Sequence, residues 1–275
     1  MVRRMTEHNV LIAGGGLTGL ALGLALDQAG IDCVIVDPAD LSARAPDFDG
    51  RAYAIALATR RMLEALGIWA ATGSEAEAIL TIRIAQGRAG AGQDPGALRF
   101  DHHEIQDGPM GHFLEDRFLR KALLDAAAAA PRVTLRSGVS LAQETALPGA
   151  IDADLSDGTQ VRARLLVAAD GRTSPVAARA GIRRLTSDYD QTSLVTAIEH
   201  ELPHHGTAHQ LFLPEGPLAI LPLPGNRSSI VWTEARARAA EIAALPDAAY
   251  LALLRPRFGR HLGEISLTGA RYSYP

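Results

Sequence analysis

The sequence has a single cysteine, Cys33, among its 275 residues. One thiol cannot form an intramolecular disulfide, so a disulfide-stabilised secreted scaffold is excluded and a reducing, cytoplasmic location is expected. Basic charge is also scarce, because 27 lysines and arginines stand against 31 acidic residues and give a net charge of −4. No global positive field attracts nucleic acid, which leaves small molecules and proteins as the expected partners.

No uncharged apolar run reaches the length of a membrane span. The stretch from Val10 to Leu26 comes nearest, and it places Gly15, Gly19 and Gly23 at the spacing of helix-dimerising membrane segments. It is shorter than the roughly 20 residues that a span needs, and three consecutive glycines interrupt it. The basic first five residues precede no separate apolar core, so they are interpreted as a frayed terminus and not as a signal peptide.

The same stretch carries a glycine-rich turn between an apolar strand, Val10–Ala13, and an apolar helix, Leu17–Ala29. Gly14 permits a tight turn, Gly16 lets the backbone approach phosphates, and Gly19 allows close packing of helix and strand. The helix N-terminus adds free N–H groups that bind a pyrophosphate, whereas the alternative is an ordinary turn without a ligand. We predict contacts with a dinucleotide from Gly14, Gly16, Leu17, Thr18 and Gly19.

An acidic residue ends the second predicted strand. The apolar run Cys33–Val36 stops at Asp37, eighteen residues after Gly19. A carboxylate at this position accepts hydrogen bonds from a ribose 2′-hydroxyl and repels a 2′-phosphate. Asp37 therefore favours FAD or NAD over NADP at this site.

Alternating strands and helices predict an α/β fold, with a Rossmann-like domain over residues 1–182. The glycine-rich region at about 76–112 is expected to contribute to a second domain. The nearly all-apolar run Leu165–Ala169 predicts a strand buried on both faces that ends at Asp170 and Gly171. Residues 183–275 contain strand-like runs between Pro-, Gly- and His-rich turns, followed by two helical stretches. They predict an α+β domain with a mainly antiparallel sheet.

Further motifs lie at Asp49–Leu57, Leu114–Arg120, Asp170–Gly171, Asp188–Thr192 and Phe212–Pro224. Together with the glycine turn, they resemble the single-component flavin-dependent aromatic hydroxylases, and most closely their ubiquinone-biosynthesis branch. The resemblance covers essentially the whole chain. It implies a glutathione-reductase-type FAD-binding domain joined to a substrate domain.

The resemblance also implies roles for individual residues. The glycine turn would bind the FAD pyrophosphate, and Asp37 would bind the adenosine ribose. Arg51 and Arg117 match family arginines that approach the flavin cofactor, and a guanidinium offers a planar fork of donors to phosphate or carbonyl oxygens. Asp170 and Gly171 match a family motif that contacts FAD and is implicated in binding reduced nicotinamide.

The implied reaction is hydroxylation of the aromatic ring of a polyprenylated phenol by dioxygen, with FAD as cofactor and NAD(P)H as co-substrate. Because FAD carries the redox chemistry, no catalytic triad is expected and no catalytic residue is assigned. Peripheral association with the inner membrane face or with a biosynthetic complex is a further implication. Two alternatives stay open, a non-catalytic flavin-fold protein that binds a prenylated partner and a flavin-dependent polyprenyl reductase.

Two features depart from the family pattern. An arginine usually follows the Ser-x-Val of the Asp-Gly motif directly, whereas here Val176 is followed by two alanines and then Arg179. A Gly-Asp-Ala-Ala-His-like motif that holds the flavin ribityl chain is expected soon after Tyr272–Pro275, where the sequence ends. We therefore expect a truncated chain that keeps at most the ADP-side contacts of FAD and is inactive alone.

Histidines cluster in one Pro- and Gly-bounded region at His204, His205 and His209. Their spacing matches no zinc-binding pattern, so they are interpreted as structural or solvent-exposed loop residues. His102 and His103 are likewise expected to be exposed. No metal site is predicted.

Overall fold

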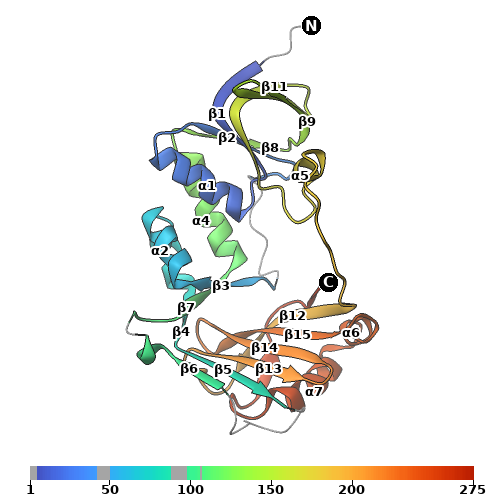
Figure 1. Ribbon diagram of the computed structural model, residues 1–275. Helices are drawn as coiled ribbons and strands as arrows, with labels where there is room; N and C mark the ends of the chain where they lie inside the picture. Colours follow the sequence, from blue (N-terminus) through green and yellow to red (C-terminus); the bar gives the residue numbers. More distant parts are fainter. Residues whose placement is uncertain (1–4, 42–49, 88–97, 106) are drawn as a thin grey trace. The chain divides into compact units, whose positions relative to one another are not determined.

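The computed structural model describes residues 5–41, 50–87, 98–105 and 107–275 (Figure 1). The chain divides into two compact units that alternate along the sequence, so neither is one continuous segment. The domain boundary that we place after residue 182 stays a prediction. The first unit comprises Met1–Ala45, Leu63–Ala71 and Leu119–Thr186, and the second comprises Pro46–Met62, Thr72–Phe118 and Ser187–Pro275.

The first unit is built on a six-stranded sheet in the order β8-β2-β1-β11-β10-β9. The four strands from β8 to β11 are parallel, whereas β10 and β9 run antiparallel, and helix α1 (Leu17–Gln28) follows β1. This confirms the Rossmann-like α/β prediction. The strands are β1 (Met5–Ala13), β2 (Cys33–Asp37), β8 (Val133–Ser137), β9 (Leu141–Leu147), β10 (Ala150–Leu155) and β11 (Gln160–Ala168).

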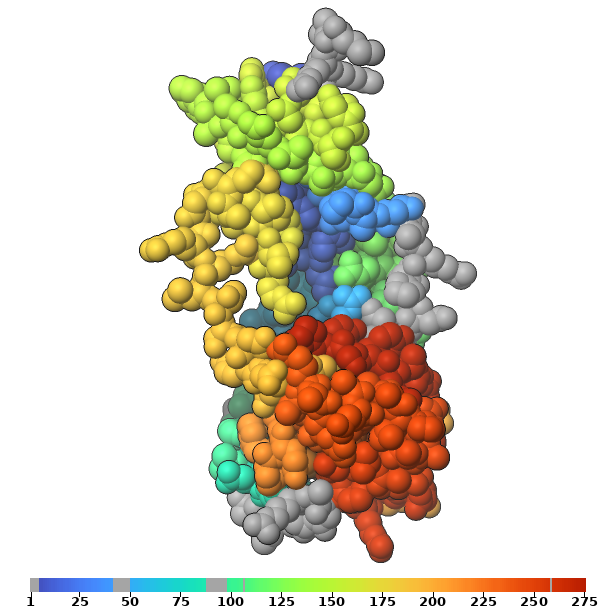
Figure 2. Space-filling model, turned by 90° about the vertical axis from the view of Figure 1, so that its right-hand side faces the viewer, coloured from blue at the N-terminus to red at the C-terminus, as the bar shows by residue number. Residues whose placement is uncertain are grey.

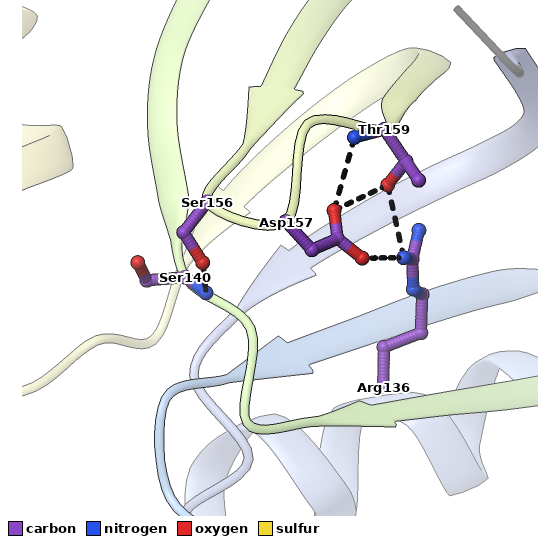
Figure 3. A network of polar contacts seen from close by, with 5 residues as sticks. All are labelled: Arg136, Ser140, Ser156, Asp157 and Thr159. Carbon is purple, nitrogen blue, oxygen red and sulfur yellow. Dashed lines mark hydrogen bonds and ion pairs between the residues drawn. The ribbon is translucent and has the colours of Figure 1, made fainter.

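A polar network closes the hairpin between β10 and β11 (Figure 3). The Asp157 carboxylate accepts hydrogen bonds from the Thr159 hydroxyl (2.7 Å) and backbone N–H (3.0 Å), and its other oxygen lies 2.5 Å from the Arg136 guanidinium. The Thr159 hydrogen bonds lower the pKa of Asp157. Because Arg136 belongs to β8, the network joins this hairpin to the far edge of the same sheet.

The carboxyl half of β11 differs from the expectation. Leu165 is 55% exposed and Ala168 is also exposed, so the prediction of burial on both faces is wrong. The reason lies in the pairing: β10 accompanies β11 only as far as Ala163, and beyond it β11 has β1 as its paired strand. An apolar run alone does not reveal where a neighbouring strand stops.

The second unit contains an eight-stranded sheet in the order β16-β12-β15-β14-β13-β5-β6, with β17 also paired to β12. All pairs are antiparallel except β13 with β5, which confirms the mainly antiparallel prediction. The strands are β5 (Thr81–Gln86), β6 (Leu98–Asp101), β12 (Gln191–His200), β13 (Thr207–Leu213), β14 (Gly216–Leu223), β15 (Arg227–Ala235), β16 (Ile265–Leu267) and β17 (Tyr272–Tyr274).

Helices α6 (Arg236–Ala243) and α7 (Asp247–Phe258) pack on this sheet, and the orange and red C-terminal segments form one mass in the space-filling view (Figure 2). Trp232 and Tyr250 lie at the centre, with ring centroids 5.5 Å apart and exposures of 1% or less. Aromatic pairs of this kind supply much of the apolar area that stabilises a core. No helix within the described residues is long and apolar enough to cross a membrane.

A smaller sheet in the order β3-β7-β4 completes the second unit. Phe113 and Ile79 from this sheet are buried with Ala197 and Leu223 from the large sheet. Strand β7 leads directly into helix α4, so Glu115 at the end of the strand is followed at once by Asp116 at the start of the helix. The remaining elements are β3 (Ala52–Ala56), α2 (Leu57–Ala65), α3 (Trp69–Thr72), β4 (Ala76–Ile79), β7 (Gly111–Glu115), α4 (Asp116–Ala129), α5 (Pro175–Arg179) and two 3-10 turns, Gly73–Glu75 and His102–Glu104.

The histidines separate into different environments. His204 is a buried structural residue whose Nε2 lies 2.9 Å from the Leu223 carbonyl oxygen, and His205 is exposed in the turn. His209 does not lie in a loop, because it belongs to β13, where it is 9% exposed and its ring centroid lies 4.5 Å from that of His261. The loop interpretation therefore fails for His209.

Acid should destabilise the protein through His209. Burial, with His261 and Arg83 nearby, lowers the pKa of His209 to about 3. As pH falls below about 6.5, the unfolded chain binds a proton that the native state excludes, so the free energy of unfolding should drop by about 2 kcal/mol at pH 5. Urea unfolding at pH 7.5 and 5.0 measures this loss. The loss of unfolding free energy should be smaller in His209→Gln and unchanged in the exposed control His205→Gln. An equal loss in the parent and both variants would contradict the assignment of this pH dependence to His209.

Candidate cofactor-binding site

The glycine turn joins β1 to α1, and its shape depends on close backbone contacts. Gly14 has φ +111°, and a Cβ there would lie 2.2 Å from the Ala169 carbonyl oxygen. A Cβ at Gly19 would lie 1.9 Å from the Gly14 carbonyl oxygen. Since real side chains cannot approach backbone atoms so closely, both positions require glycine for the turn to form. The turn therefore places β1, α1 and the end of β11 together.

Gly16 differs from the other two because the space above it is open. Its φ of −75° suits any residue, and a Cβ there would meet no atom within 4 Å. Gly16 is also the N-cap of α1, which has no side-chain cap and no acidic residue in its first turn. Leu17 and the exposed Thr18 begin this turn, whose N–H groups lack helical partners. The arrangement is an open cradle for an anion.

The Asp37 carboxylate is already oriented toward the turn. Its Oδ2 accepts a hydrogen bond from the Gly15 N–H (2.6 Å), and its Oδ1 accepts one from the Ala39 N–H (2.8 Å). A carboxylate has about four acceptor sites, so each oxygen keeps capacity for a further donor such as a ribose hydroxyl. The glycine turn and Asp37 therefore lie together at one end of the parallel strands, where dinucleotides bind in this fold.

Replacing Asp37 with alanine should weaken FAD binding by about 1–3 kcal/mol, because the charge-assisted bonds to the ribose are lost. Titration of the purified apoprotein with FAD, followed by flavin fluorescence, measures the dissociation constant. Asp32→Ala is the matched control. Asp32 lies directly before β2, the strand that Asp37 ends, and its carboxylate accepts a hydrogen bond from the Asn9 backbone N–H (3.1 Å). An Asp37→Ala dissociation constant equal to that of the control would remove Asp37 from the site.

Asp170 lies at the end of β11, beside Gly14. Its Oδ2 accepts a hydrogen bond from the Val176 N–H (3.2 Å), whereas its Oδ1 is buried without a hydrogen-bond partner among the described residues. A buried, unpaired carboxylate oxygen is costly, which indicates that it accepts a hydrogen bond from a bound ligand. The neighbouring Gly171 has φ +90° and is exposed.

Arg179, the arginine displaced by two positions in the sequence, pairs with Glu144 of β9. Its guanidinium forms a two-pronged ion pair with this carboxylate, at 2.9 Å from Nε and 2.6 Å from Nη2 to the same oxygen. The hydrogen bond to Glu144 raises the pKa of Arg179.

The two predicted arginines lie in the second unit, around a pair of buried acids. Arg51 precedes β3, and its Nη2 lies 3.3 Å from Asp116 Oδ2. Arg117 donates from Nε to Glu115 Oε2 (2.7 Å). The sequence interpretation missed Glu115 and Asp116, which are 1% and 2% exposed. Their signal was two adjacent acids directly after an apolar strand and directly before an arginine.

A small cavity of about 180 Å³ adjoins Arg51 within the second unit. Residues of β3, β12, β15 and β17 line it, and its lining is mostly apolar, with Arg51, Ser229 and two tyrosines as the polar residues. At Gly50 the chain passes so close that a Cβ would lie 2.8 Å from the Tyr272 ring. The lining residues are Gly50, Arg51, Ala52, Tyr53, Val195, Ser229, Val231 and Tyr274.

Comparison with known sequences decides the family. The profile of the FAD binding domain family matches residues 7–271. The chain belongs to this family of FAD-binding proteins. The residues of the first unit fit FAD on their own geometry as well, since the open space at Gly16, the uncapped helix and the unpaired Asp170 oxygen all suit a bound dinucleotide.

Two curated relatives of this FAD-binding family are ubiquinone hydroxylase UbiL of Rhodospirillum rubrum and 3-demethoxyubiquinol 3-hydroxylase of Escherichia coli. The first is 46% identical over 97% of this chain and 61% of its own length, and the second is 30% identical over 97% and 67%. The chain thus spans about two thirds or less of these relatives.

Solved structures show the same fold. A P. aeruginosa PqsL mutant superposes with a TM-score of 0.75 at 20% identity, covering 96% of this chain and 74% of that one. The flavin-dependent monooxygenase PieE, solved with FAD and substrate, superposes with a TM-score of 0.76 at 18% identity, covering 98% and 49%. The fold prediction is therefore confirmed by proteins of very different sequence.

Proposed function

We propose that the protein is an FAD-dependent monooxygenase that hydroxylates the aromatic ring of a polyprenylated phenol in ubiquinone biosynthesis, with NAD(P)H and dioxygen as co-substrates. The observation that carries the proposal is the 46% identity to a ubiquinone hydroxylase along 97% of this chain, including the glycine turn. The two relatives described above are named as hydroxylases, which favours ring hydroxylation over the alternatives, a non-catalytic binder and a polyprenyl reductase.

Each residue of the candidate site has a task in this proposal. The N–H groups at Gly16, Leu17 and Thr18 bind the pyrophosphate, and Asp37 binds the ribose. Asp170 accepts a hydrogen bond through its unpaired oxygen. Bound FAD would supply the redox chemistry of the hydroxylation, with NAD(P)H as reductant and dioxygen as oxidant, so that one oxygen atom enters the ring and the other leaves as water.

Arg51 and Arg117 are our further candidates for cofactor-binding residues, as the family resemblance implies. Guanidinium groups suit this role because they stay charged and match the geometry of phosphate and carbonyl oxygens. Each is held by a buried carboxylate, which fixes its direction before the cofactor arrives.

The cavity beside Arg51 is our candidate for the aromatic ring. A dry cavity of about 150 Å³ binds benzene in another protein, so a volume of about 180 Å³ suits one substituted ring. Val195 and Val231 provide apolar walls, and the Ser229 hydroxyl provides a polar contact for a phenolic oxygen.

The test is nicotinamide oxidation by the purified protein with a prenylphenol, together with product analysis. Hydroxylated product formed in step with NAD(P)H consumption supports the proposal. Tight FAD binding without turnover supports the non-catalytic binder, and a saturated prenyl chain with an unchanged ring supports the reductase.

We further propose that the protein works at the membrane surface, because a polyprenylated phenol partitions into lipid. Sedimentation with vesicles that contain a prenylphenol measures this association. Recovery of all the protein in the supernatant, with and without the prenylphenol, would contradict it.

A further inference from the structure

Cross-strand pairing arranges the side chains of the large sheet in rows that run across its strands. Paired residues on neighbouring strands share a face of the sheet, and successive residues along one strand alternate between the two faces. One such row begins on β15, at a residue that lines the cavity beside Arg51, and continues over β14, β13 and β5 to the edge strand β6 (Figure 1). Its members in order are Val231, Ala219, Gln210, Ile84 and Leu98.

The packing of the second unit agrees with this assignment of faces. Trp232 and Leu218, which alternate with members of the row along β15 and β14, are buried in the core that α6 and α7 form with the sheet. Leu221, Ala208 and Ile82, each two positions from a member of the row, belong instead to the core shared with the small sheet. The row therefore lies on the face that carries the small sheet, next to the residues that the small sheet covers.

We call this row the apolar strip. It carries no charge, and Gln210 is its one polar member. Its first four members are half-buried, and Leu98 at the far end is 63% exposed. Phe100 and Phe212 flank it on the same face and are also exposed. Clustered apolar side chains at the surface mark a site for an apolar ligand or partner.

The cavity at the start of the strip is too small for the whole substrate of the proposed function. Its volume of about 180 Å³ suits one substituted ring. A polyprenyl tail on that ring must therefore extend beyond the cavity, and it needs an apolar surface that shields it from water. Arg51 gives one side of the cavity a charge, whereas Val231 provides an apolar wall and is the first member of the strip.

We propose that the apolar strip binds the polyprenyl tail of the substrate, from the ring cavity at Val231 outward to Leu98 at the edge of the sheet. This inference rests on the proposed function and on the assignment of the ring to the cavity. An extended isoprene unit covers roughly one strand spacing of about 4.8 Å. A tail of one unit therefore reaches Ala219, and a tail of four units reaches Leu98.

Binding of phenols with tails of one and four isoprene units tests both ends of the strip. Isothermal titration calorimetry of the purified protein, with FAD present, measures the two dissociation constants without turnover. The parent should bind the four-unit phenol at least about tenfold more tightly than the one-unit phenol, because each buried CH₂ group adds about a fourfold gain in affinity. Leu98→Asp should weaken binding of the four-unit phenol about fivefold and leave the one-unit phenol unaffected.

Gln210→Leu should have the opposite effect, because it replaces the one polar member of the strip with an apolar side chain. We expect about threefold tighter binding of the four-unit phenol and no change for the one-unit phenol, whose tail ends before Gln210. Leu202→Asp is the matched control for Leu98→Asp, since Leu202 is 46% exposed and follows β12, outside the strip. Thermal unfolding checks that each variant folds. If Leu98→Asp does not fold, Gln210→Leu still tests the proposal.

Four results would overturn the proposal. They are equal affinity of the parent for the two phenols, an equal loss for both phenols in Leu98→Asp, the same loss in Leu202→Asp, and unchanged four-unit binding in Gln210→Leu. A parent dimer that Leu98→Asp converts to a monomer, with tail-dependent affinity unchanged, would make the strip an interface between copies and also overturn it.

Product analysis separates this proposal from the proposed function. Tail-dependent binding that the strip variants change, without hydroxylated product, would remove the reaction and support the strip. Hydroxylated product without tail-dependent binding would support the reaction and remove the strip. Failure of the parent to bind either phenol would overturn both.

Discussion

Valine in place of Gly16 is expected to abolish FAD retention while the protein stays folded. The backbone at Gly16 suits any residue, and a Cβ there meets no protein atom within 4 Å. The branched side chain would instead fill the space in which the pyrophosphate approaches the helix N-terminus. We expect affinity for FAD to fall by more than about 100-fold, or about 2.7 kcal/mol. Flavin content of the purified protein and the thermal midpoint measure the two halves of this prediction.

Two further glycine variants serve as controls. Gly87→Val also places valine where no atom lies within 4 Å, so flavin content and stability should both match the parent. Gly19→Val should instead destabilise the fold by more than about 3 kcal/mol, since its Cβ would collide with the Gly14 carbonyl. Parent-like flavin content in Gly16→Val would show that the open space is not a cofactor cradle.

Asparagine in place of Asp170 is expected to weaken FAD binding about tenfold and to slow flavin reduction, without loss of stability. The carboxylate oxygen that accepts no hydrogen bond destabilises the folded protein when no ligand is bound, and it contributes to FAD affinity once a donor of the cofactor binds it. The amide keeps an acceptor for the Val176 N–H and removes the buried charge. The free energy of unfolding should therefore stay the same or rise by about 1 kcal/mol, which is typical of residues selected for binding.

Stopped-flow reduction by NAD(P)H and chemical unfolding measure these two effects. Asp152→Asn is a suitable control, because Asp152 pairs with Arg162 (2.6 Å) in the same sheet but away from the glycine turn. It should leave FAD affinity and flavin reduction unchanged. Full flavin occupancy and parent-like reduction in Asp170→Asn would make Asp170 a turn residue only.

The parts of the site that sequence reasoning predicted are those with local signals. Gly14, Gly16 and Gly19 are recognisable because a strand-to-helix turn imposes its demands within six residues. Asp37 and Asp170 are recognisable because each follows an apolar strand. The Rossmann-like order of the first unit followed from the same alternation of apolar runs and breakers, whereas β9 and α5 were not predicted.

The missed features depend on partners that are distant in the sequence. Glu115 becomes a bridging residue only when β15 delivers Arg227 beside it. His209 is buried because His261 and the large sheet surround it, and nothing near it in the sequence indicates this. Leu165 is exposed because β10 ends its pairing early. Tertiary pairing decides all three outcomes, and local pattern carries no information about it.

The pairing of β1 with β11 also determines when the first sheet can form during translation. Val10 pairs with Leu165, which the ribosome adds 155 residues later, and the wall behind Gly14 is formed by Ala169. At about 5–20 residues per second, this delay lasts about 8–30 s. During that time the apolar first strand has an unpaired edge, which is a hazard for aggregation. The nascent chain therefore cannot close its cofactor turn until Ala169 has been translated, so flavin loading has to wait for the synthesis of β11.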